Sequence, residues 1–152
     1  VPEQTKGIGA DLGAGYGFLS RELLTHCPGI ERMDLYEAEY RAIGCIEQTL
    51  ADFDGRFMAH WADVLTDLPK AEYDFVVMNP PFHTGRADNS ALGRGFIRAA
   101  AQTLKPGGTL WLVANRHLPY EAELSACFKE HEMLEDEAGY KIIRAARPKR
   151  QK

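Results

Sequence analysis

The chain has few cysteines and no long apolar run. Only three of its 152 residues are cysteine, Cys27, Cys45 and Cys127, and they are widely spaced. Such a set fits neither a disulfide framework nor a zinc site, and the five histidines also lack metal-ligand spacing. No run of about 18 apolar residues and no signal peptide is visible. We therefore expect a protein of the reducing cytoplasm, without a membrane span and without a metal.

Repeats, low-complexity tracts and linkers are also missing, which favours one compact unit. The hydrophobic content of 45% over 152 residues is enough for a buried core. We expect one domain over residues 1–146 and a basic tail over 147–152. The chain opens at Val1 rather than at a methionine and enters its first expected strand within a few residues. This opening suggests an excised domain, from the C-terminal part of a longer protein.

The net charge of −4 conceals an asymmetry between the two halves of the chain. Residues 1–80 carry 6 Lys and Arg against 14 Asp and Glu, whereas residues 81–152 carry 12 against 8. A basic second half favours a phosphate-bearing partner. The alternative is that solvated surface charges simply fall this way.

Strand-like and helix-like apolar patterns alternate along the chain. Strands are expected over residues 8–12, 30–36, 56–61, 73–78 and 109–114, and then over 132–137 and 140–146, which meet at Ala138 and Gly139 as a hairpin. Helical spacing begins at residue 18, covers 42–50, runs from a cap at Asn89 or Ser90 to Leu104, and returns around 120–128. The pattern predicts an α/β fold with a mostly parallel sheet and a reversed final strand.

The strand over 73–78 ends abruptly in a polar and aromatic cluster. Two consecutive prolines stop the strand because neither can donate to a ladder. In an open parallel sheet this carboxyl end is where ligands bind. The cluster predicts a methyl-transfer site for a planar exocyclic amine, and the alternative is a plain turn. Its candidate catalytic residues are Asn79, Pro80, Pro81 and Phe82.

A glycine-rich turn lies between the first strand and the first helix. Glycines there allow a sharp turn and a close approach of backbone N–H groups to a ligand. The spacing differs from that of dinucleotide enzymes, and an acidic residue that precedes the turn suits the ammonium of S-adenosylmethionine better than a pyrophosphate. A purely structural turn is the alternative. The candidate cofactor-binding residues are Asp11, Leu12, Gly13, Ala14, Gly15, Tyr16 and Gly17.

Two further acids follow strands. Glu37, with Ala38 beside it, ends the second strand, and its carboxylate can accept both ribose hydroxyls. Glu39 is a nearby competitor, and a solvated acid at a helix start is the alternative. Asp63 follows the third strand and could accept the adenine amino group while Ala62 offers its backbone N–H to the ring. The alternative for Asp63 is a helix N-cap.

These stretches together resemble the class I S-adenosylmethionine-dependent methyltransferases over nearly the whole chain. More narrowly, the chain is similar to the ribosomal RNA guanine-N2 methyltransferases, on the stretches 79–85, 104–108, 112–120 and 140–144. The resemblance implies a Rossmann-like methyltransferase fold with seven strands, the last antiparallel, and helices on both faces. It also implies a ribosomal RNA or ribosomal subunit as partner. Many members carry an additional amino-terminal lobe that this sequence does not include.

The expected chemistry follows from the amine. The lone pair of an exocyclic N2 is delocalised into the guanine ring, and two acceptors on its N–H bonds would localise it. The Asn79 side-chain oxygen and the Pro80 carbonyl are expected to be these acceptors, and Phe82 is expected to stack on the base. Asn79 also borders the expected cofactor site. The further substrate-binding candidates are His83, Arg86, Arg116 and His117.

Three other functions remain open at the level of the sequence. The Asn79–Phe82 cluster is shared with methyltransferases that act on adenine N6 or on a protein glutamine amide. A non-catalytic lobe that binds the cofactor and docks RNA is a further alternative, and a nicotinamide dehydrogenase is a remote one. The sequence specifies neither the target guanosine nor the oligomeric state.

Overall fold

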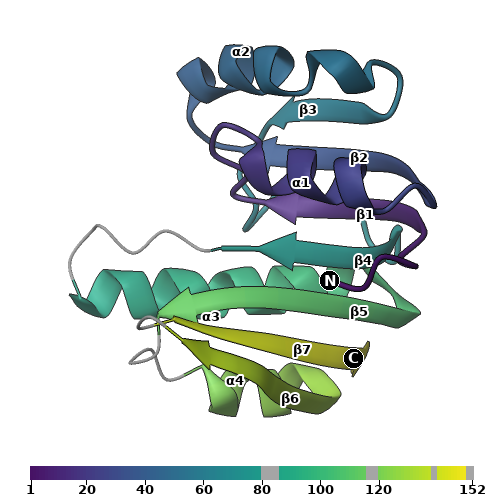
Figure 1. The fold of residues 1–152 in the computed structure, drawn as a ribbon. Helices are drawn as coiled ribbons and strands as arrows, with labels where there is room; N and C mark the ends of the chain where they lie inside the picture. Colours follow the sequence, from purple (N-terminus) through teal and green to yellow (C-terminus); the bar gives the residue numbers. More distant parts are fainter. Residues whose placement is uncertain (80–85, 116–119, 138–139, 150–152) are drawn as a thin grey trace.

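A single seven-stranded sheet organises the computed structural model, which describes residues 1–79, 86–115, 120–137 and 140–149 (Figure 1). The strand order is β3-β2-β1-β4-β5-β7-β6. The strands are β1 (Gly7–Leu12), β2 (Ile30–Glu37), β3 (Phe57–Trp61), β4 (Tyr73–Met78), β5 (Leu104–Asn115), β6 (Phe128–Glu137) and β7 (Tyr140–Pro148). β1 to β5 pair in parallel, and β7 runs antiparallel to both β5 and β6. The expected mostly parallel sheet with its last strand reversed is confirmed.

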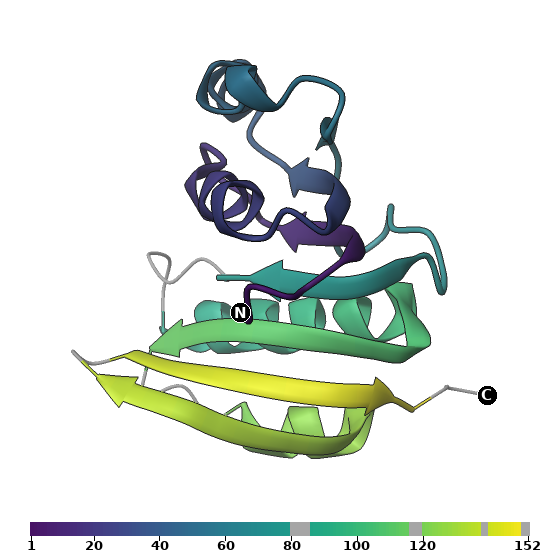
Figure 2. The ribbon, with the colours of Figure 1, turned by 45° about the vertical axis from the view of Figure 1, so that its right-hand side comes forward.

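Helices cover both faces of this sheet, as expected (Figure 2). The helices α1 (Phe18–His26) and α2 (Tyr40–Thr49) lie on one face, and α3 (Arg86–Thr103) and α4 (Glu121–Cys127) lie on the other. A short 3-10 helix, η1 (Ala51–Phe53), follows α2. No helix in the described part of the chain is both long and apolar enough to cross a membrane.

The central strand β4 shows why the sheet needs both layers. Its side chains alternate between the faces, so Phe75 and Val77 pack in the cluster beneath α1 and α2, whereas Val76 and Met78 pack in the cluster beneath α3 and α4. All four side chains are buried. A strand that is apolar on both faces is stable only between two layers, which places β4 at the middle of the fold.

The boundary between α3 and β5 differs from the expected one. The helix begins at Arg86, so Asn89 and Ser90 lie inside it and neither is its cap. It ends at Thr103, and Leu104 already belongs to β5, where it pairs with Tyr73. The four residues from 105 to 108, which we expected to end the helix, are part of this strand and occupy an irregularity in its register with β4. Buried Leu104 anchors the early start of the strand.

The C-terminal strands are longer than expected. β6 begins at Phe128, and β7 continues to Pro148, two residues past the expected end. Hydrogen bonds hold the end of β7: the Arg147 guanidinium donates to Glu130 at 2.6 Å, and the Lys149 backbone N–H donates to the Cys127 carbonyl at 2.7 Å. The expected hairpin turn at 138–139 lies outside the described residues.

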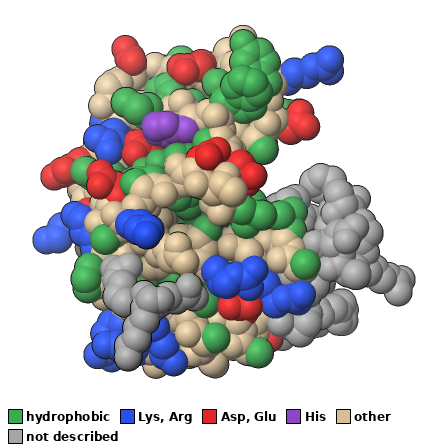
Figure 3. Space-filling model, turned by 180° about the vertical axis from the view of Figure 1, so that it is seen from behind, with side chains coloured by type: hydrophobic (Ala, Val, Ile, Leu, Met, Phe, Trp, Pro, Cys, Tyr) green, Lys and Arg blue, Asp and Glu red, His purple; other side chains and the backbone are tan. Residues whose placement is uncertain are grey.

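The charge asymmetry of the sequence has a spatial counterpart. Figure 3 views the molecule from behind, and acidic side chains gather over its upper part, where β2, β3 and α2 lie. Lysine and arginine side chains gather toward the lower part, over the end of the sheet formed by β5, β7 and β6. The two halves of the sequence are therefore two electrostatically different ends of one sheet.

Candidate active site

A cavity of about 910 Å³ opens at the carboxyl ends of β1, β2 and β4. The helix after β1 and the helix after β4 lie on opposite faces of the sheet, although the two strands are neighbours. This reversal separates the connecting segments and leaves a crevice, the usual ligand site of an open α/β sheet. The volume is in the range of cofactor pockets, roughly 300–1,000 Å³.

The glycine-rich turn after β1 forms one wall of the cavity. Gly13, Gly15 and Gly17 all have positive φ values, of 72°, 60° and 90°, which side chains rarely tolerate. The N–H groups of Gly13 and Ala14 donate to the Tyr36 carbonyl at 2.9 and 3.0 Å, so the turn is tied to β2. The glycines therefore fix a left-handed turn whose backbone can lie close to a ligand.

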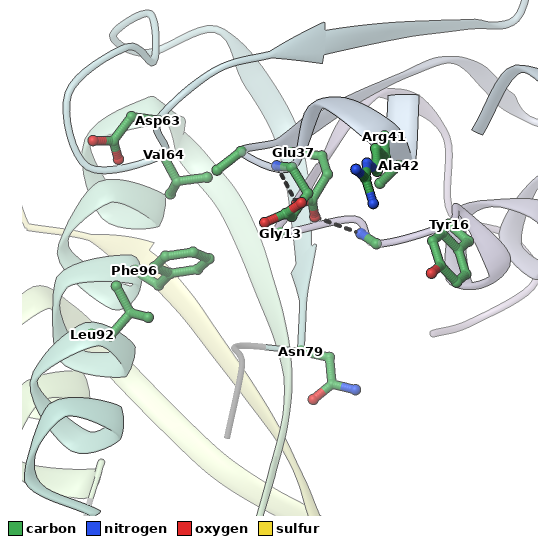
Figure 4. Close-up of a pocket in the computed structure, with 13 residues that line it drawn as sticks. Gly13, Tyr16, Glu37, Arg41, Ala42, Asp63, Val64, Asn79, Leu92 and Phe96 are labelled. Atoms are coloured by element: carbon green, nitrogen blue, oxygen red, sulfur yellow. Dashed lines mark hydrogen bonds between the residues drawn. The ribbon is translucent and has the colours of Figure 1, made fainter. Parts of the chain in front are cut away.

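Glu37 lies at the centre of the site, at the end of β2. One carboxylate oxygen accepts the Gly15 N–H and the other accepts the Glu39 N–H, each at 2.8 Å (Figure 4). These contacts hold the carboxylate in one orientation at the cavity without a cation. Because each carboxylate oxygen accepts more than one hydrogen bond, Glu37 keeps capacity for hydroxyl groups of a ligand.

An apolar slot with an acid at its end extends to the other side of Glu37. Ala38, Val64, Leu92 and Phe96 line it, and the Asp63 carboxylate stands at its rim. The Asp63 carboxylate also accepts the Leu65 N–H at 2.9 Å, but it caps a turn, because residues 64–67 form no helix and Asp63 is therefore not the helix N-cap considered as the alternative. A slot of this kind accepts a flat ring whose exocyclic amine is directed at the acid.

Asn79 lies at the opposite side of the cavity, directly after β4. Its side chain lines the cavity and is drawn at the lower part of the opening in Figure 4. The neighbouring candidates 80–83 lie outside the described residues, as do Arg116 and His117, and Arg86 is described only as the first residue of α3. The structure thus brings Asn79 to the same cavity as Glu37, Asp63 and the glycine turn.

Asp11 lies deeper than expected. Its side chain is only 2% exposed and accepts the Ser20 hydroxyl at 2.8 Å, beneath the turn rather than in the lining of the cavity. Burial raises the pKa of the Asp11 carboxyl to about 7; the Ser20 hydrogen bond opposes this rise, and the nearby Glu37 carboxylate adds to it. Leu12 and Gly17 are likewise buried, and Ala14 is not in the lining.

Ala62 also differs from its expected role. Its backbone N–H donates to the Glu37 carbonyl at 3.1 Å and so extends the pairing of β2 with β3. That N–H is already used within the sheet edge, and Ala62 does not line the cavity. We therefore assign Ala62 to the support of Glu37.

Several cavity residues were not recognised in the sequence as part of the site. Ala42, Leu92 and Phe96 have the spacing of ordinary core positions on helix faces, because a wall of a cavity and a core have the same apolar pattern, and Val64 follows Asp63 without any motif. Arg41 carried no motif at all, yet its side chain lines the cavity beside Glu37 (Figure 4). Only its spacing of four residues from Glu37 could have indicated its place.

A buried polar cluster supports β2 on the face of the sheet that α3 and α4 cover. The Tyr73 hydroxyl donates to Asp34 at 2.7 Å, and the Tyr36 hydroxyl hydrogen bonds to the Tyr73 hydroxyl. Arg32 pairs with Asp34 at 2.8 Å, and the His60 ring stacks on Tyr36 at 4.6 Å between centroids. Burial raises the pKa of Tyr73, so its proton stays in place for Asp34. The cluster anchors Tyr36, whose carbonyl holds the glycine turn.

This geometry agrees with the comparison to known proteins. Residues 1–144 match the family model described as methyltransferase small domain. The chain belongs to this family. S-adenosylmethionine, the cofactor expected from the sequence, is the cofactor of the family.

Two curated relatives act on ribosomal RNA. The chain is 35% identical over 143 residues to ribosomal RNA small subunit methyltransferase C of Cronobacter sakazakii, which covers 93% of this chain and 41% of the relative. It is 33% identical over 138 residues to ribosomal RNA large subunit methyltransferase G of Streptomyces avermitilis, covering 90% and 36%. The chain thus spans about two fifths of the length of these relatives.

Comparison with solved structures supports the same family and fold. The 16S rRNA N2 methyltransferase of T. thermophilus, solved in complex with AdoMet and guanosine, has a TM-score of 0.76 and 32% identity, over 92% of this chain and 37% of that one. A protein described as a predicted O-methyltransferase from Agrobacterium tumefaciens has a TM-score of 0.80 at 24% identity, over 97% and 76%, and shows likeness of fold alone. The expected family and fold are both confirmed.

Proposed function

We propose that this protein transfers a methyl group from S-adenosylmethionine to the exocyclic N2 amine of a guanosine in ribosomal RNA. The observation that carries the proposal is the position of Asn79, at the end of β4 and in the same cavity as Glu37 and the glycine turn. An acceptor for an amine thus borders a site for the methyl donor. A ribosomal RNA substrate is consistent with the cytoplasmic location that we expected from the cysteines.

In this proposal, different residues of the cavity bind different parts of the cofactor. Glu37 accepts the ribose hydroxyls, Asp63 accepts the adenine amine at the end of the apolar slot, and the turn from Gly13 to Gly17 borders the methionine part. Buried Asp11 lies beneath that turn, and in its ionised form it adds negative potential below the ammonium, a longer-range effect than the direct contact expected from the sequence. When bound, the cofactor supplies an electrophilic methyl group on a sulfonium.

The exocyclic N2 amine is a poor nucleophile, and the protein has to make it more nucleophilic. In our proposal the Asn79 side-chain oxygen and the Pro80 carbonyl each accept one N–H of the amine, which localises the nitrogen lone pair toward the methyl donor. Pro81 keeps this segment rigid, and Phe82 stacks on the base. Positioning and aligned dipoles carry the rate enhancement, without a covalent enzyme intermediate. A paired or stacked guanosine must first be extruded from its helix.

The choice of guanosine N2 rests on two supports of different kinds. The first is the resemblance of the stretch 112–120 to the guanine-N2 family, and the second is the identity of 32–35% to relatives that are named for methylation of ribosomal RNA. His83, Arg86, Arg116 and His117 are the side chains we propose for contacts with the RNA. Their position after β4 and β5 would direct them to the same rim.

A methylation assay with labelled cofactor tests the proposal. We expect transfer to RNA, and N2-methylguanosine after its digestion to nucleosides. N6-methyladenosine or a methylated glutamine would instead support one of the alternative nitrogens, and no transfer to any acceptor would support a non-catalytic lobe. The methylated nucleotide can then be located by comparing RNA from cells with and without the protein.

The variant Asn79→Ala tests the role of the amide directly. We expect a loss of kcat of roughly 10²–10³-fold, typical of the removal of one oriented polar group. Cofactor affinity, measured by calorimetry, should fall far less. Gln48→Ala, which removes an exposed amide from α2, is the matched control and should leave both unchanged. Equal losses of kcat and of affinity in Asn79→Ala would mean that Asn79 only shapes the cofactor pocket.

A further inference from the structure

Two large aromatic side chains are exposed beside the glycine-rich turn, and one of them, Tyr16, lines the cavity. Tyr16 is 57% exposed and Phe18 is 61% exposed. Their rings meet edge to face, with centroids 6.5 Å apart and an interplanar angle of 82°. The two rings expose apolar surface to water instead of packing in the core. Exposed apolar surface of this kind often marks a binding site.

The backbone holds this pair rigidly. Tyr16 lies between Gly15 and Gly17, which both have positive φ, and the Gly17 N–H donates to the Ala14 carbonyl at 3.0 Å. Phe18 is the first residue of α1. Both rings therefore project from the fixed glycine turn, and Tyr16 lines the same cavity as Asn79. A platform of this kind is ordered before its ligand arrives, which reduces the entropic cost of binding.

A guanidinium lies at the same opening. Arg41 extends from α2 toward the space between Glu37 and Tyr16 (Figure 4), and its side chain is exposed. Among the described residues, Glu37 forms no ion pair with it, and the contacts of the Glu37 carboxylate are the backbone N–H groups of Gly15 and Glu39. Within the described part of the chain, no hydrogen bond or ion pair engages Arg41. Its charge is available to an anionic ligand.

We infer that Tyr16, Phe18 and Arg41 bind the nucleotide next to the target guanosine. The unpaired base stacks on the aromatic pair, and Arg41 contacts its phosphate. Aromatic rings beside an arginine are the combination with which proteins hold single-stranded nucleic acid. The inference rests on the proposed function, and it adds a contact on the acidic half of the chain, where the charge balance alone indicated none.

This assignment explains why the ring surface lies apart from the apolar slot of the cavity. The apolar slot for a flat ring of the cofactor is built from Ala38, Val64, Leu92 and Phe96, on the other side of Glu37. Tyr16 and Phe18 contribute no side chain to that slot. A base that stacks on them belongs to a second molecule that enters through the mouth.

Fluorescence of a labelled oligonucleotide tests the inference. The probe is a short single-stranded RNA that contains one guanosine and has 2-aminopurine as its neighbour, with S-adenosylhomocysteine present. We expect the wild-type protein to quench 2-aminopurine by stacking. Phe18→Leu should lose the quenching and bind the RNA roughly 5- to 50-fold more weakly, while Phe18→Tyr should retain both. Arg41→Gln should lower the slope of log affinity against log salt by about 0.7.

Matched controls separate this effect from a general loss of exposed groups. Met133→Ala and Leu134→Ala remove apolar side chains that are 57% and 46% exposed on β6, and Lys70→Gln removes an exposed charge outside the cavity lining. These controls should bind as the wild type does. A loss of cofactor affinity in Phe18→Leu and Arg41→Gln that equals the loss of RNA affinity would overturn the inference, because the residues would then serve the cofactor.

The two proposals fail in different ways. If the wild-type protein methylates RNA but Phe18→Leu and Arg41→Gln bind and quench as it does, the nucleotide platform is wrong and the proposed function stands. If the wild-type protein neither binds RNA nor methylates it, the proposed function is wrong as well.

Discussion

Two acids at the cavity and three acids near β5, β7 and β6 are held in different ways. In the second group, Arg144 contacts Glu132 at 2.9 Å and Glu130 at 3.4 Å, and Lys141 contacts Glu121 at 2.6 Å. At the cavity, Asp11 accepts a hydrogen bond from the Ser20 hydroxyl and Glu37 accepts from backbone N–H groups, and among the described residues neither pairs with a cation. The acids near β5, β7 and β6 thus form ion pairs, whereas those at the cavity are held in place without one.

The two groups of acids differ in their cost to the stability of the protein. An ionised carboxylate without a cation is unfavourable when it is buried, and folded proteins retain such groups mainly where function needs them. The pKa of Asp11, raised to about 7 chiefly by burial, records this cost. Glu121, Glu130 and Glu132 carry no comparable penalty, because they are exposed and each has a lysine or arginine within 4 Å.

Asp11→Asn gives the largest expected effect. The folded pKa of Asp11 lies above its ordinary value of 3.8, so the folded state binds the proton more tightly than the unfolded state does. This group therefore lowers the free energy of unfolding as the pH rises from about 4 to about 7. Removal of the charge should stabilise the protein at pH 8 by about 2–4 kcal/mol and have little effect below pH 4.

Urea unfolding at a series of pH values, without cofactor, measures this. Ser20→Ala is the informative companion, because it removes the hydroxyl that favours the ionised form and should steepen the loss of stability with pH. A wild-type protein and an Asp11→Asn variant with parallel stability profiles between pH 4 and 8 would show that Asp11 ionises normally.

Glu37→Ala should give the next largest effect, on binding rather than on folding. The variant loses the acceptor for the ribose hydroxyls and releases the N–H groups of Gly15 and Glu39. Charged hydrogen bonds of this kind contribute about 1.5–3 kcal/mol, so we expect cofactor affinity to fall roughly 10- to 150-fold. Isothermal titration calorimetry with S-adenosylmethionine measures the change. Retention of wild-type affinity would remove Glu37 from the cofactor site.

Glu132→Ala is the matched substitution at the other end of the sheet and should have the smallest effect. The Glu132 side chain is 54% exposed and its ion pair with Arg144 is screened by water. Arg144 also keeps its contact with Glu130. We expect a loss of no more than about 0.5 kcal/mol in unfolding free energy, and no change in cofactor affinity. A cofactor effect from this variant would show that the two ends of the sheet are coupled.

The sequence was sufficient for the strands and for the main-chain parts of the site. Buried strands such as Tyr73–Met78 have a strong local pattern, and a turn such as Gly13–Gly17 has no other common use between a strand and a helix. The reversed strand β7 followed from a hairpin at the end of an alternating series. Glu37 and Asn79 were found because parallel strands bring their carboxyl ends to one edge.

The parts of the site that the sequence did not predict depend on burial and on tertiary packing. Nothing local distinguishes Asp11 below the turn from an acid at its mouth, because burial is set by Ser20 and the packing of α1. Leu92 and Phe96 read as core, since a helix face over a cavity and a helix face over a strand have the same period. The start of α3 at Arg86 was missed because an internal Asn89 and Ser90 look like caps when the sequence is read alone.

The position of β7 has a consequence for how the protein is made. This strand comes last in the sequence, yet it lies between β5 and β6. During synthesis β6 therefore has no neighbour to pair with until the final residues of β7 leave the ribosome, and its edge remains open until then. A chain truncated before Tyr140 should therefore keep its first five strands able to pair, while β6 stays unpaired and sensitive to proteases.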